Sequence, residues 1–113
     1  MEMRNEAVIL QPVIAGVLAS LKGLPLTGEY EEDIDGVTMQ CAEFPDEYEN
    51  APTLEEARMK LVKGLKGWAE SFTDNFEEMT RGREKEVPYL LKILISTEEE
   101  LLSCLRSSRH ESI

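Results

Sequence analysis

The chain has 113 residues, 42% of them hydrophobic, and a formal net charge of −11. A single domain of this length can bury a hydrophobic core without disulfide or metal staples, and its apolar content argues against disorder of the whole chain. Binding to a phosphate backbone depends on clustered Lys and Arg, so the negative charge argues against direct binding to DNA or RNA.

The first predicted element is a helix that ends near residue 22. Its apolar positions recur at helical spacing, at Val13, Ile14, Val17, Leu18 and Leu21. Pro12 suits the first turn of this helix and Gly23 suits its C-terminal stop. Residues 5–10 either extend the helix through a kink or form a strand. The apolar run 7–18 is too short to span a membrane, and the segment before it is net negative, so neither a membrane anchor nor a signal peptide is expected.

Two strands and a tight turn are predicted next. Apolar and polar residues alternate over residues 24–34 and again over residues 37–41. Asp35-Gly36 lies between them and supplies the positive φ angles of a two-residue hairpin turn. Phe44-Pro45 ends the second strand, and residues 47–50 form a short third strand.

A long amphipathic helix is predicted to begin after Thr53, whose hydroxyl can cap the amide of Glu56 while the Glu56 carboxylate reaches back. One apolar stripe runs along this helix, and we expect these residues of it to form the structural core: Leu54, Leu61, Leu65, Trp68 and Phe72. Close approach of another segment is a candidate reason for Gly64 and Gly67.

The basic residues of the same helix occupy its other faces, at Arg58, Lys60, Lys63 and Lys66. We interpret them mainly as solvent contacts, with salt bridges to acidic residues as the alternative. After a polar linker at 80–86, residues 87–95 favour a strand, followed by a helix capped at Ser96-Thr97. A single long helix that starts at Pro88 is the other interpretation.

No catalytic, cofactor-binding or metal-binding residues are predicted. Cys41 and Cys104 are far apart, and His110 is the only histidine, so ligands for a zinc site and a base for a nucleophile are both lacking. Asp33 and Asp35 share a face at a turn, where hydration explains them. We therefore expect a protein that is not an enzyme, with two cysteines packed as small apolar groups in the reducing cytoplasm.

The negative charge is concentrated in one third of the chain. Residues 24–57 contain eleven acidic residues and no basic residue, whereas the remaining residues carry equal numbers of each. Such a region attracts cationic partners, although a charge run can also serve only for solubility. The predicted partner-binding surface consists of Glu29, Glu31, Glu32, Asp33, Asp46, Glu47 and Glu49.

The order of motifs in residues 24–72 adds a resemblance to a known family. A hairpin leads to Cys41-Ala42-Glu43-Phe44-Pro45, and seven residues later Thr53-Leu54-Glu55-Glu56-Ala57 opens the amphipathic helix. This arrangement resembles the HicB-like antitoxin domain. The resemblance implies an α+β fold: a small curled antiparallel sheet of three to four strands, packed by one long amphipathic helix, with extra N-terminal and C-terminal helices.

In domain terms we expect a single HicB-like domain over residues 1–113. Its core covers residues 24–76, with an N-terminal helical extension at 1–23 and a C-terminal strand-helix element at 87–106. Residues 92–106 are similar to the start of a ribbon-helix-helix, but only seven residues follow Arg106, so operator binding is not expected.

The family resemblance also implies a function in protein binding. It implies an antitoxin that neutralises a small basic toxin, which cleaves messenger RNA, by covering its active surface. The alternative is a solitary oligomeric scaffold, or a phage-type accessory protein, of the same fold without a toxin partner. In both cases we expect a homo-oligomer with no cofactor, no membrane and no direct nucleic-acid partner.

Overall fold

Four strands form one open sheet with the order β3-β2-β1-β4. They are β1 (Leu26–Asp33), β2 (Gly36–Cys41), β3 (Tyr48–Ala51) and β4 (Leu105–Arg109). The computed structural model describes residues 3–44 and 47–109, with side chains from residue 12 onward. The mixed α+β class and the short third strand agree with the sequence predictions.

The hairpin between β1 and β2 is present, but its turn lies one residue earlier than predicted. Asp33 pairs with Gly36, so the two-residue loop is Ile34-Asp35. A side-chain oxygen of Asp33 accepts a hydrogen bond of 2.8 Å from the Asp35 amide and stabilises the turn. Gly36 has a φ of +130°, and a Cβ atom there would lie 2.5 Å from the Ala51 carbonyl oxygen. Gly36 therefore lets β2 approach the end of β3.

The sheet is not purely antiparallel, which corrects the sequence prediction. β4 runs parallel to β1, with a register from Leu26 opposite Leu105 to Tyr30 opposite Arg109. A parallel neighbour requires a long crossover connection, and most of the chain between the two strands supplies it. Strand β4 was not predicted, because Leu105 is its only buried residue.

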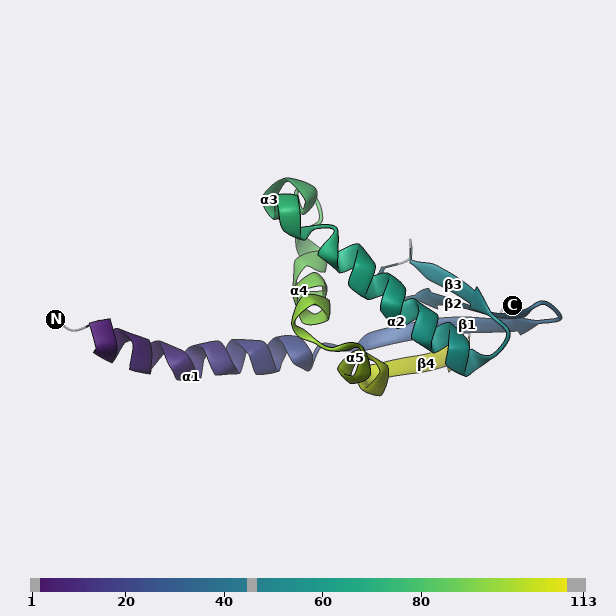
Figure 1. Cartoon of the computed structure of the whole chain (residues 1–113), viewed down its shortest axis with the longest axis horizontal. Helices are drawn as coiled ribbons and strands as arrows, with labels where there is room; N and C mark the ends of the chain where they lie inside the picture. The colour runs from purple at the N-terminus through teal and green to yellow at the C-terminus, as the bar shows by residue number, and fades with distance from the viewer. Residues whose placement is uncertain (1–2, 45–46, 110–113) are drawn as a thin grey trace.

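Helix α2 (Leu54–Glu70) packs across one face of the sheet (Figure 1). The Thr53 hydroxyl accepts from the Glu56 amide at 3.2 Å, as the predicted cap requires. Leu61, Leu65 and Phe72 are buried, whereas Leu54 and Trp68 are partly buried against the same core. The apolar stripe thus joins the sheet to the helices that follow.

The segment predicted as a strand at 87–95 is helix α4 (Val87–Ile95), followed by helix α5 (Glu98–Cys104). The strand prediction was wrong because tertiary packing overrides β propensity: Leu90 and Ile93 lie three residues apart and are both buried. The single long helix was wrong as well, since Ser96 is extended and Thr97 forms a complete capping box with Glu100. The connection from α2 contains η1 (Thr73–Asn75), α3 (Phe76–Met79) and η2 (Glu84–Glu86).

Helix α1 (Met3–Lys22) continues through Pro12, which answers the open question about residues 5–10. Pro12 lies in the middle of the helix, so its predicted first-turn position was wrong. Figure 1 shows α1 projecting from the body, at the end opposite the β1-β2 hairpin. In the described part of the chain, no helix is both long and apolar enough to cross a membrane.

Two basic side chains of α2 pack inward, which corrects their interpretation as solvent contacts. Arg58 donates to the carbonyl oxygens of Leu102 at 2.8 Å and Leu105 at 3.0 Å. Lys66 donates to the carbonyl oxygens of Ile93 at 3.1 Å and Ser96 at 2.8 Å. These bonds satisfy carbonyl groups at the ends of α4 and α5 and fix both helices on α2.

Candidate partner-binding surface

Part of the predicted acidic surface lies on the sheet face opposite α2. Alternation along β1 places Glu29 and Glu31 on this face, while Leu26 faces the core. Glu29 and Glu31, together with Thr38 and Gln40 of β2, line a shallow hollow of about 170 Å³. Every side chain that lines the hollow is polar, so this face offers hydrogen bonds and negative charge.

The other predicted acidic residues of β1 lie partly on this face and partly on the opposite one. Asp33 shares the face of Glu31, but one of its oxygens is used in the turn. Glu32 is exposed and pairs with Val37, whose side chain is buried on the α2 face. The predicted surface is therefore spread over both faces of the hairpin.

Glu47 and Glu49 lie beside α2 at Gly64. A Cβ atom at Gly64 would lie 3.1 Å from Oε1 of Glu49 and 3.9 Å from Oε2 of Glu47. Gly64 thus leaves room for a carboxylate, which agrees with the predicted close approach, whereas a Cβ atom at Gly67 would meet nothing within 4 Å. Asp46, the seventh predicted residue, lies outside the described residues.

A groove of about 440 Å³ opens between the end of β2, helix α2 and the segment 83–86. Phe44 and Trp68 line it, with ring centroids 4.6 Å apart and ring planes inclined at 51°. Glu43 and Glu47 also line the groove, as do Arg83, Lys85 and Glu86. The groove therefore combines a partly exposed indole with carboxylates, a combination that can hold a cationic side chain.

Glu43 is fixed in place by backbone and side-chain contacts. Its Oε1 atom accepts from the Thr27 amide at 2.8 Å and from the Cys41 thiol at 3.7 Å. Burial raises the pKa of Cys41 from 9.0 to about 12, so this thiol is protonated and unreactive at neutral pH. Cys41 thus packs as a small apolar group, as predicted.

This groove is not predicted from the sequence, where Trp68 belongs to the apolar stripe and Glu43 and Phe44 belong to the end of the second strand. Their combination brings a partly exposed aromatic side chain beside carboxylates. The available signal was local: Phe44 is an apolar residue between Glu43 and Glu47, and Trp68 is the only tryptophan of the chain.

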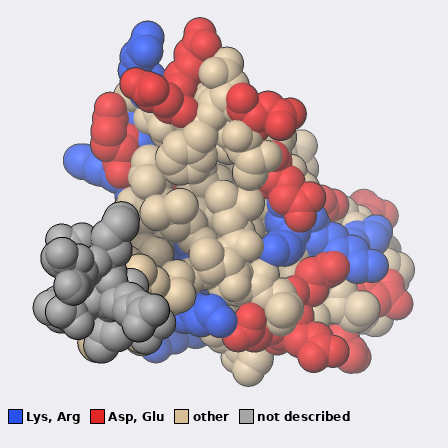
Figure 2. Space-filling model, turned by 60° about the vertical axis from the view of Figure 1, so that its left-hand side comes forward, with Lys and Arg blue, Asp and Glu red and all other residues tan. Residues whose placement is uncertain are grey.

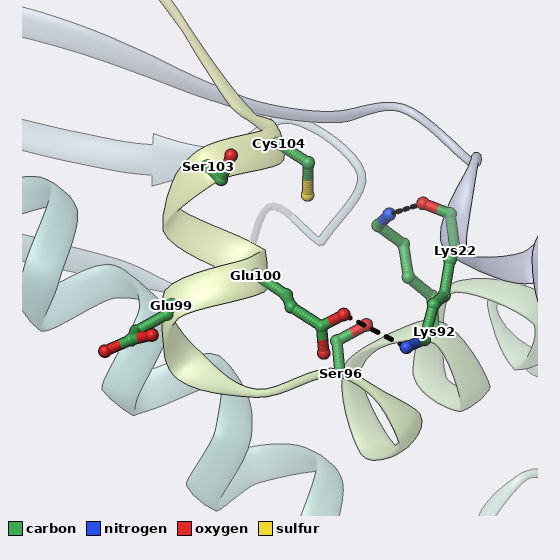
Figure 3. Close-up of a pocket in the computed structure, with 7 residues that line it drawn as sticks. All are labelled: Lys22, Lys92, Ser96, Glu99, Glu100, Ser103 and Cys104. Atoms are coloured by element: carbon green, nitrogen blue, oxygen red, sulfur yellow. Dashed lines mark hydrogen bonds and ion pairs between the residues drawn. The ribbon is translucent and has the colours of Figure 1, made fainter.

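A second pocket, of about 390 Å³, lies where α1 meets α4 and α5 (Figure 3). Lys92 is 1% exposed, and its ammonium group donates to the carbonyl oxygen of Lys22 at the end of α1. The Lys22 ammonium pairs with Glu100 Oε2 at 3.0 Å, whereas Glu99 points away from this pair. Among the described residues no group of three or more His, Cys, Asp or Glu is placed to hold a metal ion.

Comparison with known proteins shows a relationship of fold but not of sequence. No family model matches the chain, and no curated protein does either. A crystal structure of the antitoxin part of a proposed toxin/antitoxin system from Syntrophomonas wolfei subsp. wolfei superimposes with a TM-score of 0.77. The identity is 19%, and the match covers 85% of this chain and 71% of that chain. The α+β fold is therefore shared with an antitoxin, while the HicB-like resemblance stays a prediction.

Proposed function

We propose that this chain is a non-enzymatic antitoxin of the HicB-like type, which neutralises a small basic toxin by binding to it in the cytoplasm. The observation that carries the proposal is the likeness of fold to the antitoxin part of the Syntrophomonas system over 85% of the chain. The motif order in residues 24–72 supports it independently. An mRNA-cleaving toxin is the partner that the family resemblance implies.

The distribution of charge supports a cationic partner. All of the net negative charge lies within residues 24–57, which form β1, β2, β3 and the start of α2. Electrostatic complementarity raises the association rate of a basic partner and rejects acidic ones. We expect the partner to approach this end of the molecule.

The groove between Glu43 and Trp68 offers an anchoring site for that partner. A Lys or Arg side chain over the Trp68 ring would gain a cation-π contact, and the carboxylates of Glu43 and Glu47 would pair with its charge. The acidic sheet end would then guide the encounter, and the groove would fix the bound complex.

Co-purification from the native host, followed by mass spectrometry, is the first test. We expect a small basic protein whose association rate falls as salt is added, because surface charges act mainly on encounter. Recovery of the chain alone as a self-assembled oligomer, or with an acidic partner that is indifferent to salt, would favour the solitary scaffold.

Charge reversal then locates the surface. The triple variant Glu31→Lys, Glu32→Lys, Glu49→Lys should slow association about tenfold or more at low salt while leaving the melting temperature nearly unchanged. The matched control reverses three exposed residues outside the acidic region, Glu70, Glu77 and Glu99. Equal slowing by both triple variants would show that only the total charge matters and would contradict the assignment to this surface.

A further inference from the structure

Helix α1 exposes a continuous apolar face. Val13, Ile14, Val17 and Leu18 are 59%, 55%, 54% and 41% exposed, respectively. Their spacing places them on the same side of the helix. Single exposed apolar residues are common on proteins, but a contiguous set of large ones marks an interaction surface.

The sequence of α1 suits pairing with another helix. Residues 7–21 contain no charged residue, although the chain as a whole has a net charge of −11. Apolar residues in this stretch follow the alternating three-four spacing of a coiled-coil seam, at Ala7, Leu10, Ile14, Val17 and Leu21. The other side of the described part of the helix carries small residues, among them Ala15, Gly16 and Ala19. In residues 12–22, the part of α1 whose side chains the structure describes, the large apolar side chains therefore lie on one side.

The base of α1 is fixed to the body of the molecule. Lys92 donates to the last carbonyl group of the helix, and Lys22 pairs with Glu100 of α5 (Figure 3). These contacts hold the C-terminal end of α1 against α4 and α5. The apolar face is therefore presented in a defined direction, on a helix that extends away from the sheet in Figure 1.

We propose that α1 is a self-association surface, on which the α1 helix of a second copy packs in the antiparallel direction. The charge distribution decides between the two directions. In an antiparallel pair the acidic bodies lie at opposite ends, about 30 Å apart or more for a 20-residue helix. That separation exceeds the Debye length of about 8 Å at physiological salt. In a parallel pair the two acidic bodies would lie side by side and repel one another.

The size of the surface predicts a modest affinity. A helix about 30 Å long and about 10 Å wide projects roughly 300 Å² onto its partner. Counted on both copies, this area is about 600 Å², which is below the roughly 1,200–2,000 Å² that stable interfaces bury in total. Figure 2 brings the α1 side forward and shows an uncharged area in the middle of the visible face, with basic and acidic side chains around it. From the size of the helix face, we expect weak dimerisation, with a dissociation constant of roughly 100 μM.

Sedimentation equilibrium of the full chain tests the proposal, with two double variants that add the same charge. Ile14→Glu with Leu18→Glu changes the apolar face and should raise the dimer dissociation constant about 100-fold or more, because like charges would face each other in the pair. Ala15→Glu with Ala19→Glu changes exposed residues of the opposite side and should leave that constant within about threefold of the unsubstituted chain. Circular dichroism checks that both variants remain helical.

Small-angle X-ray scattering tests the direction of pairing. The single chain is 67 Å long, so an antiparallel dimer that overlaps along α1 should measure about 100 Å, whereas a parallel dimer should stay near the length of one chain. A maximum dimension near 70 Å for the dimer would overturn the antiparallel arrangement.

Three results would overturn the self-association proposal itself. The first is a monomer at every concentration up to about 0.5 mM, where a dissociation constant of roughly 100 μM would leave most of the chain dimeric. The second is a dimer that both double variants affect equally. The third is a monomer that binds phosphatidylcholine vesicles, or a different protein, in a manner that depends on Ile14 and Leu18. The proposal does not depend on the antitoxin function, because these measurements use the chain alone.

Discussion

Helices α1 and α2 carry similar apolar stripes, yet the two stripes have opposite surroundings. Leu61 and Leu65 of α2 are 1% and 0% exposed, whereas Ile14 of α1 is 55% exposed. Helix α2 lies between the sheet and the two helices α4 and α5, while only the base of α1 meets the rest of the chain. Apolar periodicity therefore specifies a face that needs a partner, but it does not specify whether that partner is in the same molecule.

The largest expected effect on the free energy of unfolding comes from loss of packing between α2 and the sheet. Leu65→Ala should lower the free energy of unfolding by about 2–5 kcal/mol, because it removes buried methyl groups and leaves a cavity. The matched control is Met59→Ala on the exposed side of the same helix, with an expected loss below about 1 kcal/mol. Urea unfolding measures both changes. A loss below about 0.5 kcal/mol for Leu65→Ala would show that α2 does not cover the sheet in solution.

The next largest effect on stability concerns Arg58, whose guanidinium group links α2 to α5 and β4. Arg58→Met keeps much of the side-chain volume but removes the donors to the Leu102 and Leu105 carbonyl oxygens. Hydrogen bonds of charged groups contribute about 1.5–3 kcal/mol, so we expect destabilisation of about 2 kcal/mol. Hydrogen exchange should quicken first in α5 and β4. Lys63→Met, at an exposed position of the same helix, should leave stability and exchange nearly unchanged.

Local patterns predicted the elements between residues 26 and 70 because each has its own signal there. Alternation predicted β1 and β2, and the Thr53 cap predicted the start of α2. The end of the chain is different: α4 has β-branched residues but follows the helical spacing of Leu90 and Ile93, which pack in the core. Strand β4 pairs with the free edge of β1, and Arg58 binds the carbonyl groups of Leu102, before the strand, and of Leu105, its first residue. Neither contact leaves a local pattern in the sequence.

The same limit applies to the candidate surface. Charge counting located the acidic third of the chain, but it did not divide the carboxylates between the two faces of the sheet. The groove depends on Trp68 of α2 meeting Phe44 of the β2-β3 connection, residues that are far apart in the sequence. Composition and spacing can predict a surface of one charge, whereas a groove requires the packing of distant segments.

The burial of Cys41 in the core predicts a smaller effect, a fall in the free energy of unfolding at alkaline pH. Cys41 is buried, and its pKa is raised from 9.0 to about 12 by burial, so folding favours the protonated thiol. The resulting stabilisation is complete below about pH 9 and is lost as the pH rises from 9 toward 12. Cys41→Ala should therefore flatten the fall in stability over this alkaline range, as thermal melts at several pH values can measure. An unchanged slope would contradict the burial of this thiol.

The smallest expected effect on the stability of the isolated chain comes from Ile14→Ala on α1, which is the counterpart of Leu65→Ala on α2. Ile14→Ala removes a side chain that is already half exposed, and alanine is the better helix former by a few tenths of a kcal/mol. In dilute protein these contributions nearly cancel, so the free energy of unfolding should change by less than about 0.5 kcal/mol. At high concentration a self-associated chain gains stability by mass action, and its melting temperature rises with protein concentration. Ile14→Ala should reduce that rise while leaving the dilute value unchanged. A large loss in dilute protein would mean that Ile14 packs within its own chain, and the contrast between α1 and α2 would then disappear.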